Sequence, residues 1–139
     1  MMSRISFSTV GETEFQKLLG HNPEIMKQWN YLGDILSREG QLSSDLKEQV
    51  RRKLAFGNKC EYCMAKGKPS EKQLDEKTNM AVTFADIFLN HRSSIDDNTF
   101  DVLKETFNEQ EIIELCSFIC FTTASQQFGA MMNLKPAKQ

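Results

Sequence analysis

The sequence predicts an all-α fold, a compact bundle of about six or seven helices that forms one domain over residues 1–139. Residues that cap helices recur along the chain, and apolar residues follow them at intervals of three and four. No stretch shows a sustained alternation of apolar and polar residues, apart from a weak one at residues 5–8. No segment rich in Pro, Gly or Ser divides the chain, so we do not expect a second domain.

The first expected helix begins at Pro23 and ends before Gly40. Asn22 is a favourable capping residue, Pro23 suits the first helical position, and Glu24 places a negative charge in the first turn. The apolar residues that follow have helical spacing: Ile25, Met26, Trp29, Leu32, Ile35 and Leu36.

The second expected helix begins at Asp45 and ends at Gly57. Asp45 and Glu48 are three residues apart and match an Asp version of the capping box. The apolar face of this helix consists of Leu46, Val50 and Leu54.

The second half of the chain contains a loop at residues 66–70, followed by further helical regions. Residues 71–89 are compatible with one broken helix or two adjoining helices. Asp97 can cap the next helix, and Asn108 can cap a last, strongly apolar helix that extends to about Met131.

The composition excludes several classes of protein. Seventeen Lys and Arg against nineteen Asp and Glu give a formal charge of −2, whereas nucleic-acid binders usually have a basic excess. The longest apolar stretch, residues 115–121, is much shorter than a membrane span. Residues 1–15 lack the apolar segment of a signal peptide, and residues 135–139 are expected to form a frayed tail. We therefore expect a cytoplasmic protein that binds neither nucleic acid nor membrane.

Cys60 and Cys63 form a C-x-x-C pair, which in a reducing compartment indicates redox chemistry or metal binding. If Asn58 caps a short helix, Cys60 is its second residue and Cys63 its fifth, so both lie on one face and can form a disulfide. The positive end of the helix favours a thiolate. Glu61 opposes this effect, and Lys59 partly offsets Glu61.

Cys116 and Cys120 lie in the apolar last helix, and we expect them to be core residues. The alternative is a zinc site formed by these two cysteines together with Cys60 and Cys63.

Glu48 stands twelve residues before Cys60, where its carboxylate could accept a proton from a thiol directly or through a water molecule. This spacing of Glu, Cys and Cys, within residues 46–63, resembles the carboxymuconolactone decarboxylase superfamily. Within that superfamily the chain is most similar to the alkyl hydroperoxidase D branch.

The resemblance implies an all-α protein that assembles as a homo-trimer or homo-hexamer and reduces peroxides. By matching position, Cys63 would be the peroxidatic thiol, Cys60 the resolving thiol and Glu48 the proton acceptor. The resemblance implies no metal or other cofactor: an external thiol reductant protein would reduce the Cys60–Cys63 disulfide.

The sequence departs from the pattern of the branch at two positions. A His stands four residues after the second Cys in that pattern, and in some members another stands between the cysteines, whereas this chain has Gly67 and Tyr62 there. Tyr62 could donate a hydrogen bond to a thiolate or a substrate oxygen. His91 is a possible auxiliary residue, although we expect both His91 and His21 to lie on the surface.

Two further groups of residues have a structural and a functional interpretation. The aromatic residues Trp29, Phe84, Phe88, Phe118 and Phe121 could line an access channel, but their helical spacing favours the core. The basic residues 51–53 could attract anionic partners, but a solvated helix face is the simpler expectation.

The leading hypothesis is a thiol-dependent antioxidant oxidoreductase, a peroxidase or disulfide reductase, that uses Cys60, Cys63 and Glu48. One alternative is a lyase of the carboxymuconolactone decarboxylase type, which would need acid and base groups but not two cysteines. The other is a non-enzymatic oligomer that senses redox state or binds zinc.

Overall fold

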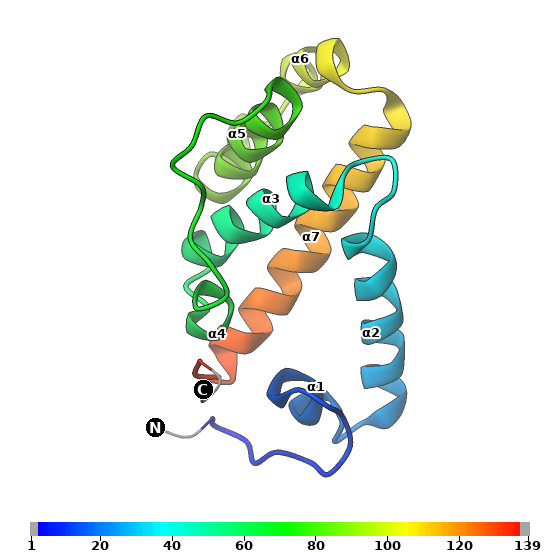
Figure 1. The fold of residues 1–139 in the computed structure, drawn as a ribbon, viewed down its shortest axis with the longest axis vertical. Coiled ribbons are helices and arrows are strands. Elements are labelled where there is room, and N and C mark those ends of the chain that lie inside the picture. The colour runs from blue at the N-terminus through cyan, green and yellow to red at the C-terminus, as the bar shows by residue number, and fades with distance from the viewer. Residues whose placement is uncertain (1–2, 137–139) are drawn as a thin grey trace.

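The computed structural model describes residues 3–136, and within them every regular element is helical (Figure 1). This confirms the predicted all-α class. The helices are, in chain order, α1 Glu14–Leu19, α2 Pro23–Ser37, α3 Ser44–Gly57, α4 Glu61–Met64, α5 Glu76–Asn90, the 3-10 helix η1 Arg92–Ser94, α6 Asp97–Thr106 and α7 Glu109–Met131.

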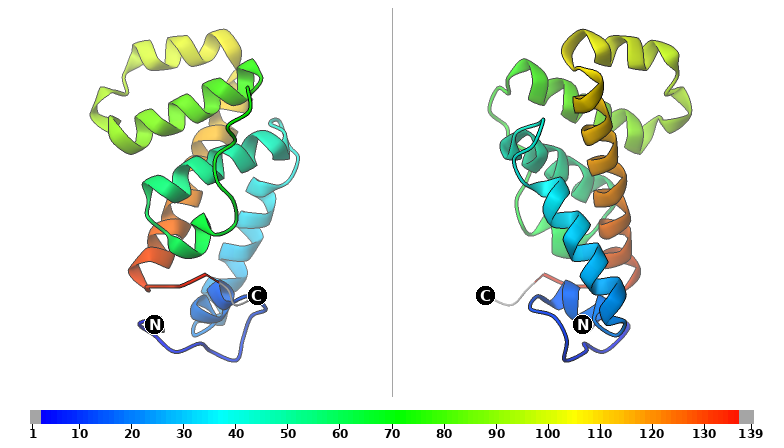
Figure 2. Two further views of the ribbon diagram at one scale, coloured as in Figure 1. Left: turned by 60° about the vertical axis from the view of Figure 1, so that its left-hand side comes forward. Right: turned by 90° about the vertical axis from the view of Figure 1, so that its right-hand side faces the viewer.

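The long helix α7 runs through the molecule, and α3 and α2 both pack against it (Figure 1). Helix α5 covers α3, and α5 and α6 form a helical pair at one end of the molecule (Figure 2). The short helices α1 and α4 lie at the opposite end, near the last turn of α7. None of the described helices is long and apolar enough to cross a membrane.

Two apolar clusters hold these helices together. The larger one fills the space between α3, α5 and α7, and its fully buried members are Val50, Leu54, Ala81, Ala85 and Leu115. The smaller cluster contains both Cys60 and Cys63 together with Leu18, Ala55, Tyr62 and Leu134. The C-x-x-C pair is therefore built into a packed part of the molecule and does not lie on a free loop.

Several helix boundaries agree with the sequence. Helix α2 begins at Pro23, α3 ends at Gly57, and α7 begins after Asn108. Asn108 and Glu111 form a reciprocal capping box, in which each side chain accepts a hydrogen bond from the other residue's backbone N–H.

Other caps differ from the predictions. Ser43, not Asp45, caps α3, because its hydroxyl accepts a hydrogen bond from the Leu46 N–H at 3.1 Å. Asp96, not Asp97, caps α6. In both places several capping residues are adjacent, and the side chain that reaches the free N–H groups decides the boundary.

Two segments were assigned incorrectly from the sequence. The region 71–89 is neither a broken helix nor two adjoining ones: a single helix begins at Glu76, and residues 71–75 are not helical. Helix α1 was not predicted at all, although Thr13 and Gln16 form a capping box. In the expected tail, residues 135 and 136 are not helical, and the Lys135 Nζ lies 2.8 Å from Glu61 Oε2. Residues 137–139 of that tail lie outside the described residues.

Candidate active site

Cys60 and Cys63 form a disulfide at the start of α4, with their Cα atoms 5.2 Å apart. Lys59, just before, has a φ of 56°, which turns the chain from α3 into α4. Cys60 itself is the N-cap of α4, and its Sγ accepts a hydrogen bond from the Cys63 N–H at 3.2 Å. The prediction that Asn58 caps this helix is wrong, because Asn58 is the C-cap of α3.

Both cysteines are buried, but they differ in their position relative to a cavity. Cys60 is fully buried, whereas Cys63 is 9% exposed and lines a cavity of about 310 Å³. Gly129 of α7 lies against Cys60, and a Cβ atom there would be 3.0 Å from Cys60 Sγ. A molecule that enters the cavity therefore meets Cys63, with Cys60 behind it.

Aromatic side chains form much of the cavity wall. They are Phe15, Trp29, Tyr62, Phe118 and Phe121, from α1, α2, α4 and α7. Trp29 packs against Phe121, and its indole N–H donates to Ser125 Oγ at 3.0 Å. The expectation that these residues belong to the core holds for Phe84 and Phe118, which are members of the larger core cluster, and Phe88 and Phe121 pack against that cluster. Phe118 and Phe121 also line the cavity. The expectation is wrong for Trp29, which lines the cavity and belongs to neither apolar cluster.

Glu48 lies one turn before Arg51 on α3, and two arginines hold its carboxylate. Arg51 donates to it from Nε at 2.6 Å and from Nη2 at 2.9 Å, and Arg52 donates from Nε at 3.0 Å. Burial alone would raise the pKa of Glu48, but the hydrogen bonds from Arg51 and Arg52 outweigh it, so the pKa is lowered. Glu48 is therefore ionised at neutral pH.

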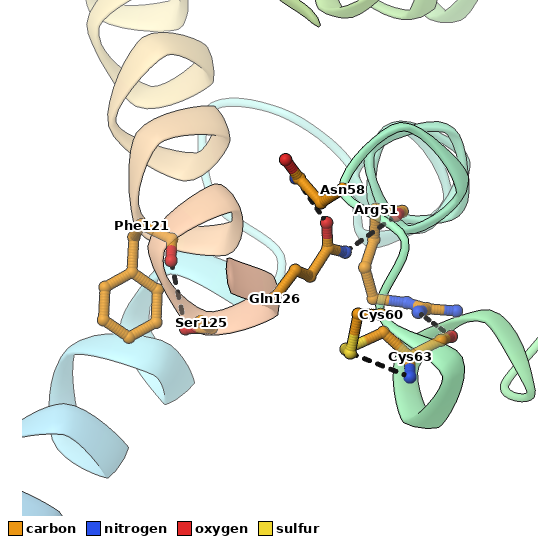
Figure 3. The surroundings of a disulfide bond; sticks show 7 residues. All are labelled: Arg51, Asn58, Cys60, Cys63, Phe121, Ser125 and Gln126. Atoms are coloured by element: carbon orange, nitrogen blue, oxygen red, sulfur yellow. Dashed lines mark hydrogen bonds between the residues drawn. A yellow bond between two sulfur atoms is a disulfide. The ribbon is translucent and has the colours of Figure 1, made fainter. Parts of the chain in front are cut away.

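Arg51 also connects Glu48 to the disulfide. Its Nη1 donates to the Cys63 carbonyl oxygen at 3.1 Å, and its side chain lines the cavity (Figure 3). The expectation that residues 51–53 form only a solvated helix face is therefore wrong for Arg51. The i,i+3 spacing of Glu48 and Arg51 was a signal for their pairing that was available in the sequence.

Gln126 of α7 is a second residue that sequence reasoning missed. Its Oε1 accepts from Asn58 Nδ2 at 2.9 Å, and its Nε2 donates to the Arg51 carbonyl oxygen at 3.1 Å (Figure 3). Gln126 is buried and ties α7 to the last turns of α3, which carries Glu48 and Arg51. No local signal marks it, because its partners are far away in the sequence.

Tyr62 and Lys66 lie on the cavity wall beside Cys63. The Lys66 ammonium is 4.5 Å from the centroid of the Tyr62 ring, a cation–π contact. Burial raises the pKa of Tyr62, while a hydrogen bond with Thr13 acts in the opposite direction. Desolvation of the ammonium group, and next the charge of Arg51, lower the pKa of Lys66.

The histidines lie away from this site. His91 is the C-cap of α5, and the Nε2 atom of His21 is 2.6 Å from the Ser6 carbonyl oxygen. Both are exposed, as expected, and neither lines the cavity, so the structure does not bring the possible auxiliary residue His91 to Cys63.

Gly67 occupies the position where the alkyl hydroperoxidase D pattern has a histidine. It has a φ of 141°, and a Cβ atom there would lie 2.9 Å from the Arg52 guanidinium. Arg52 also donates to the Lys68 carbonyl oxygen at 3.1 Å, so the loop is built around this guanidinium.

Cys116 and Cys120 do not join the site. Cys116 is partly buried and Cys120 is exposed, so the expectation that both are core residues is wrong for Cys120. Within residues 3–136 no group of three or more His, Cys, Asp and Glu side chains is arranged to hold a metal ion. The four-cysteine zinc alternative therefore has no support from the described geometry.

The comparisons with known proteins identify the fold. No family model and no curated protein sequence matches the chain. The structure is similar to that of an uncharacterized peroxidase-related protein from Silicibacter sp. TM1040, with a TM-score of 0.78 and 19% identity over 89% of this chain and 76% of that one. It is also similar to an alkylhydroperoxidase AhpD core, an uncharacterized peroxidase-related protein from Ralstonia eutropha JMP134, with a TM-score of 0.73 and 16% identity over 88% and 75% of the two chains.

These similarities confirm the predicted alkyl hydroperoxidase D-like fold. Because fold alone does not determine activity, the roles of Cys60, Cys63 and Glu48 stay predictions that rest on the site itself.

Proposed function

We propose that this chain is a thiol-dependent peroxidase that reduces organic hydroperoxides by cycling Cys60 and Cys63 between dithiol and disulfide. One observation carries the proposal: Cys63 forms part of the wall of a cavity that five aromatic side chains also line, and its disulfide partner Cys60 is fully buried behind it. The aromatic wall favours a hydroperoxide that carries an apolar group. The fold, shared with peroxidase-related proteins, agrees with this assignment.

The proposed reaction follows from the positions of the two cysteines relative to the cavity. The Cys63 thiolate attacks the terminal oxygen of the hydroperoxide, the O–O bond breaks, and an alcohol leaves with a sulfenic acid on Cys63. The Cys60 thiol then attacks the Cys63 sulfur, a disulfide forms and water leaves. A dithiol reductant attacks the disulfide from the cavity side and restores both thiols. The two Cα atoms are 5.2 Å apart, which is within the range that a disulfide spans.

Glu48 is the proposed proton acceptor that generates the thiolate. Its ionised carboxylate can take up a proton, and Arg51 links it to the backbone of Cys63. The proton would pass from the thiol to Glu48 through a water molecule, because the contact between them is made by Arg51 and not by the two side chains directly.

Reduction of a disulfide substrate by the same dithiol is the weaker form of this proposal, because a protein disulfide would have to reach Cys63 through the cavity.

Assembly as a homo-trimer or homo-hexamer also stays a proposal. Helix α2 supports it: only Leu36 is buried on this helix, and Ile25, Tyr31 and Leu32 are exposed.

The test counts free thiols and maps disulfides by mass spectrometry before and after an equimolar pulse of cumene hydroperoxide. The proposal predicts loss of two thiols through a Cys60–Cys63 link that dithiothreitol reverses. Cys60→Ser should accumulate a sulfenic acid on Cys63, and Cys63→Ser should not react. Cys120→Ser is the matched control, because Cys120 is exposed and outside the cavity. Four unreacted thiols in the fully reduced protein would exclude the proposed function.

A further inference from the structure

The cavity beside Cys63 contains a cation that the motif of Glu and two cysteines does not include. Lys66 follows α4 by two residues and lines the cavity together with Cys63 and Tyr62. Its ammonium group rests on the Tyr62 ring, 4.5 Å from the centroid. Its backbone N–H donates to the Cys63 carbonyl oxygen at 3.2 Å, which fixes the residue next to the cysteine.

We propose that Lys66 is the general acid of the peroxidase reaction and protonates the alkoxide that leaves when Cys63 attacks a hydroperoxide. This inference rests on the proposed function and adds a catalytic residue to it.

The proton balance requires such a group. When the Cys63 thiolate bonds to the terminal oxygen, the electron pair of the O–O bond goes to the other oxygen, and an alkoxide forms. An alkoxide is a far stronger base than water, so a positioned acid accelerates its departure, by roughly 10²–10⁴-fold for general acid catalysis. Lys66 gives up one proton, the alcohol leaves, and Lys66 regains a proton from solvent because the residue is exposed.

The other titratable and charged groups near the cavity suit this role less well. Arg51 already donates three hydrogen bonds, and a guanidinium does not release its proton. Glu48 is ionised and carries no proton to donate. Tyr62 holds its proton more tightly than an ordinary tyrosine, because burial raises its pKa. Asp34 lines the cavity from α2 and is exposed, whereas Lys66 is fixed next to Cys63 by its backbone hydrogen bond.

The pKa of Lys66 fits the assignment. Desolvation and the charge of Arg51 lower it, which makes the ammonium a stronger acid than that of a lysine in water. The attraction of Glu48 acts in the opposite direction and is the smallest of the three effects.

The test compares peroxides with different leaving groups in single-turnover reactions of the fully reduced protein. Cumene hydroperoxide releases a strongly basic alkoxide, and peracetic acid releases acetate, which needs no proton. Lys66→Met should slow oxidation of Cys63 by cumene hydroperoxide on the order of 10²-fold and leave the reaction with peracetic acid almost unchanged. Lys68→Met is the matched control: Lys68 lies in the same loop, is exposed and is outside the cavity.

Two outcomes would overturn the inference. An equal loss of rate with both oxidants would show that Lys66 acts on the thiolate or on the fold. Recovery of the cumene hydroperoxide rate in Lys66→Arg would show that only the positive charge matters, because a guanidinium does not release its proton. If the wild-type protein reacts with neither oxidant, the proposed function itself is wrong and this inference is wrong with it, a result distinct from the other two.

Discussion

The guanidinium of Arg51 donates a hydrogen bond to the carbonyl oxygen of Cys63, 3.1 Å away. The same guanidinium holds the Glu48 carboxylate through two further hydrogen bonds. The acid and the second cysteine of the motif are therefore joined by a residue that the spacing of the motif does not specify. Any account of how Glu48 acts on Cys63 has to include Arg51.

Arg51→Lys should weaken this connection, because an ammonium group cannot reproduce the planar fork that binds two carboxylate oxygens and a carbonyl oxygen together. We expect a loss of about 1–3 kcal/mol in the free energy of unfolding from the hydrogen bonds to charged groups. The pKa of Glu48 should rise, since burial would then be opposed mainly by Arg52. Urea unfolding measures the stability, and the pH dependence of thiol oxidation should move with the pKa of Glu48.

Arg52→Lys is the control for this prediction. Arg52 makes one hydrogen bond to Glu48 and one to the Lys68 carbonyl oxygen, so its loss should change the pH dependence less. Equal effects of the two substitutions would mean that the contact between Arg51 and Cys63 has no special importance.

Glu48→Gln should remove a contribution to stability that depends on pH. A carboxyl whose pKa is lower in the folded chain than in the unfolded chain stabilises the fold at pH values above its ordinary pKa, which is 4.5 for Glu. This contribution is lost as the pH falls through the lowered pKa. The wild-type protein should therefore be more stable than the variant at neutral pH, and the difference should shrink as the pH falls below 4.5.

The measurement is urea unfolding of the wild-type protein and Glu48→Gln at a series of pH values from neutral to below 4.5. Other carboxyls with lowered pKa values, such as Glu111 and Asp75, are present in both proteins and cancel in the comparison. A difference in stability that does not change with pH would contradict the prediction.

The fold could be predicted from the sequence because its signals are local. Pro23 marks the start of α2, Gly57 the end of α3 and Asn108 the start of α7, and each is read from a few adjacent residues. Helix α1 was missed because it spans only six residues and lacks a long apolar pattern. Caps were misplaced where neighbouring residues compete, as at Ser43 and Asp45.

The candidate site could be predicted only in part. Cys60, Cys63 and Glu48 stand out because their spacing is a property of one segment. Trp29 and Gln126 reach the site only through the packing of α2 and α7 against α3 and α4, and such contacts leave no local pattern. The pairing of Glu48 with Arg51 lies between these cases, because its helical spacing was visible but its link to Cys63 was not.

Gly67→His should not restore a more active enzyme, although it restores the histidine of the alkyl hydroperoxidase D pattern. At a φ of 141° any side chain is strained. A Cβ atom at this position would lie 2.9 Å from the Arg52 guanidinium, which would have to shift. We expect a loss of roughly 1–3 kcal/mol in stability and no gain in peroxide reduction. Gly67→Ala is the matched control, since it has the same backbone strain without the imidazole.

Urea unfolding and the rate of thiol oxidation give both readouts. A histidine variant that is as stable as the wild-type protein and faster would show that the loop adapts and that the imidazole takes over proton transfer. A histidine variant with the stability of the alanine variant and no gain in rate would agree with the prediction.

Trp29 should report directly on occupancy of the cavity. It is the single tryptophan of the chain, it lines the same cavity as Cys63, and its indole N–H is held by Ser125. Cumyl alcohol, the product of cumene hydroperoxide, should therefore cause a saturable change in tryptophan emission as it displaces water from the aromatic wall.

Gly33→Leu should abolish this change, because even a Cβ atom there would be 3.3 Å from the Phe121 ring and a longer side chain would fill the space. Tyr31→Leu, on the same helix but 67% exposed and outside the cavity, should leave the titration unaltered. A titration that Gly33→Leu does not affect would place the alcohol elsewhere, and the aromatic cavity would then no longer be the binding site for the organic part of the substrate.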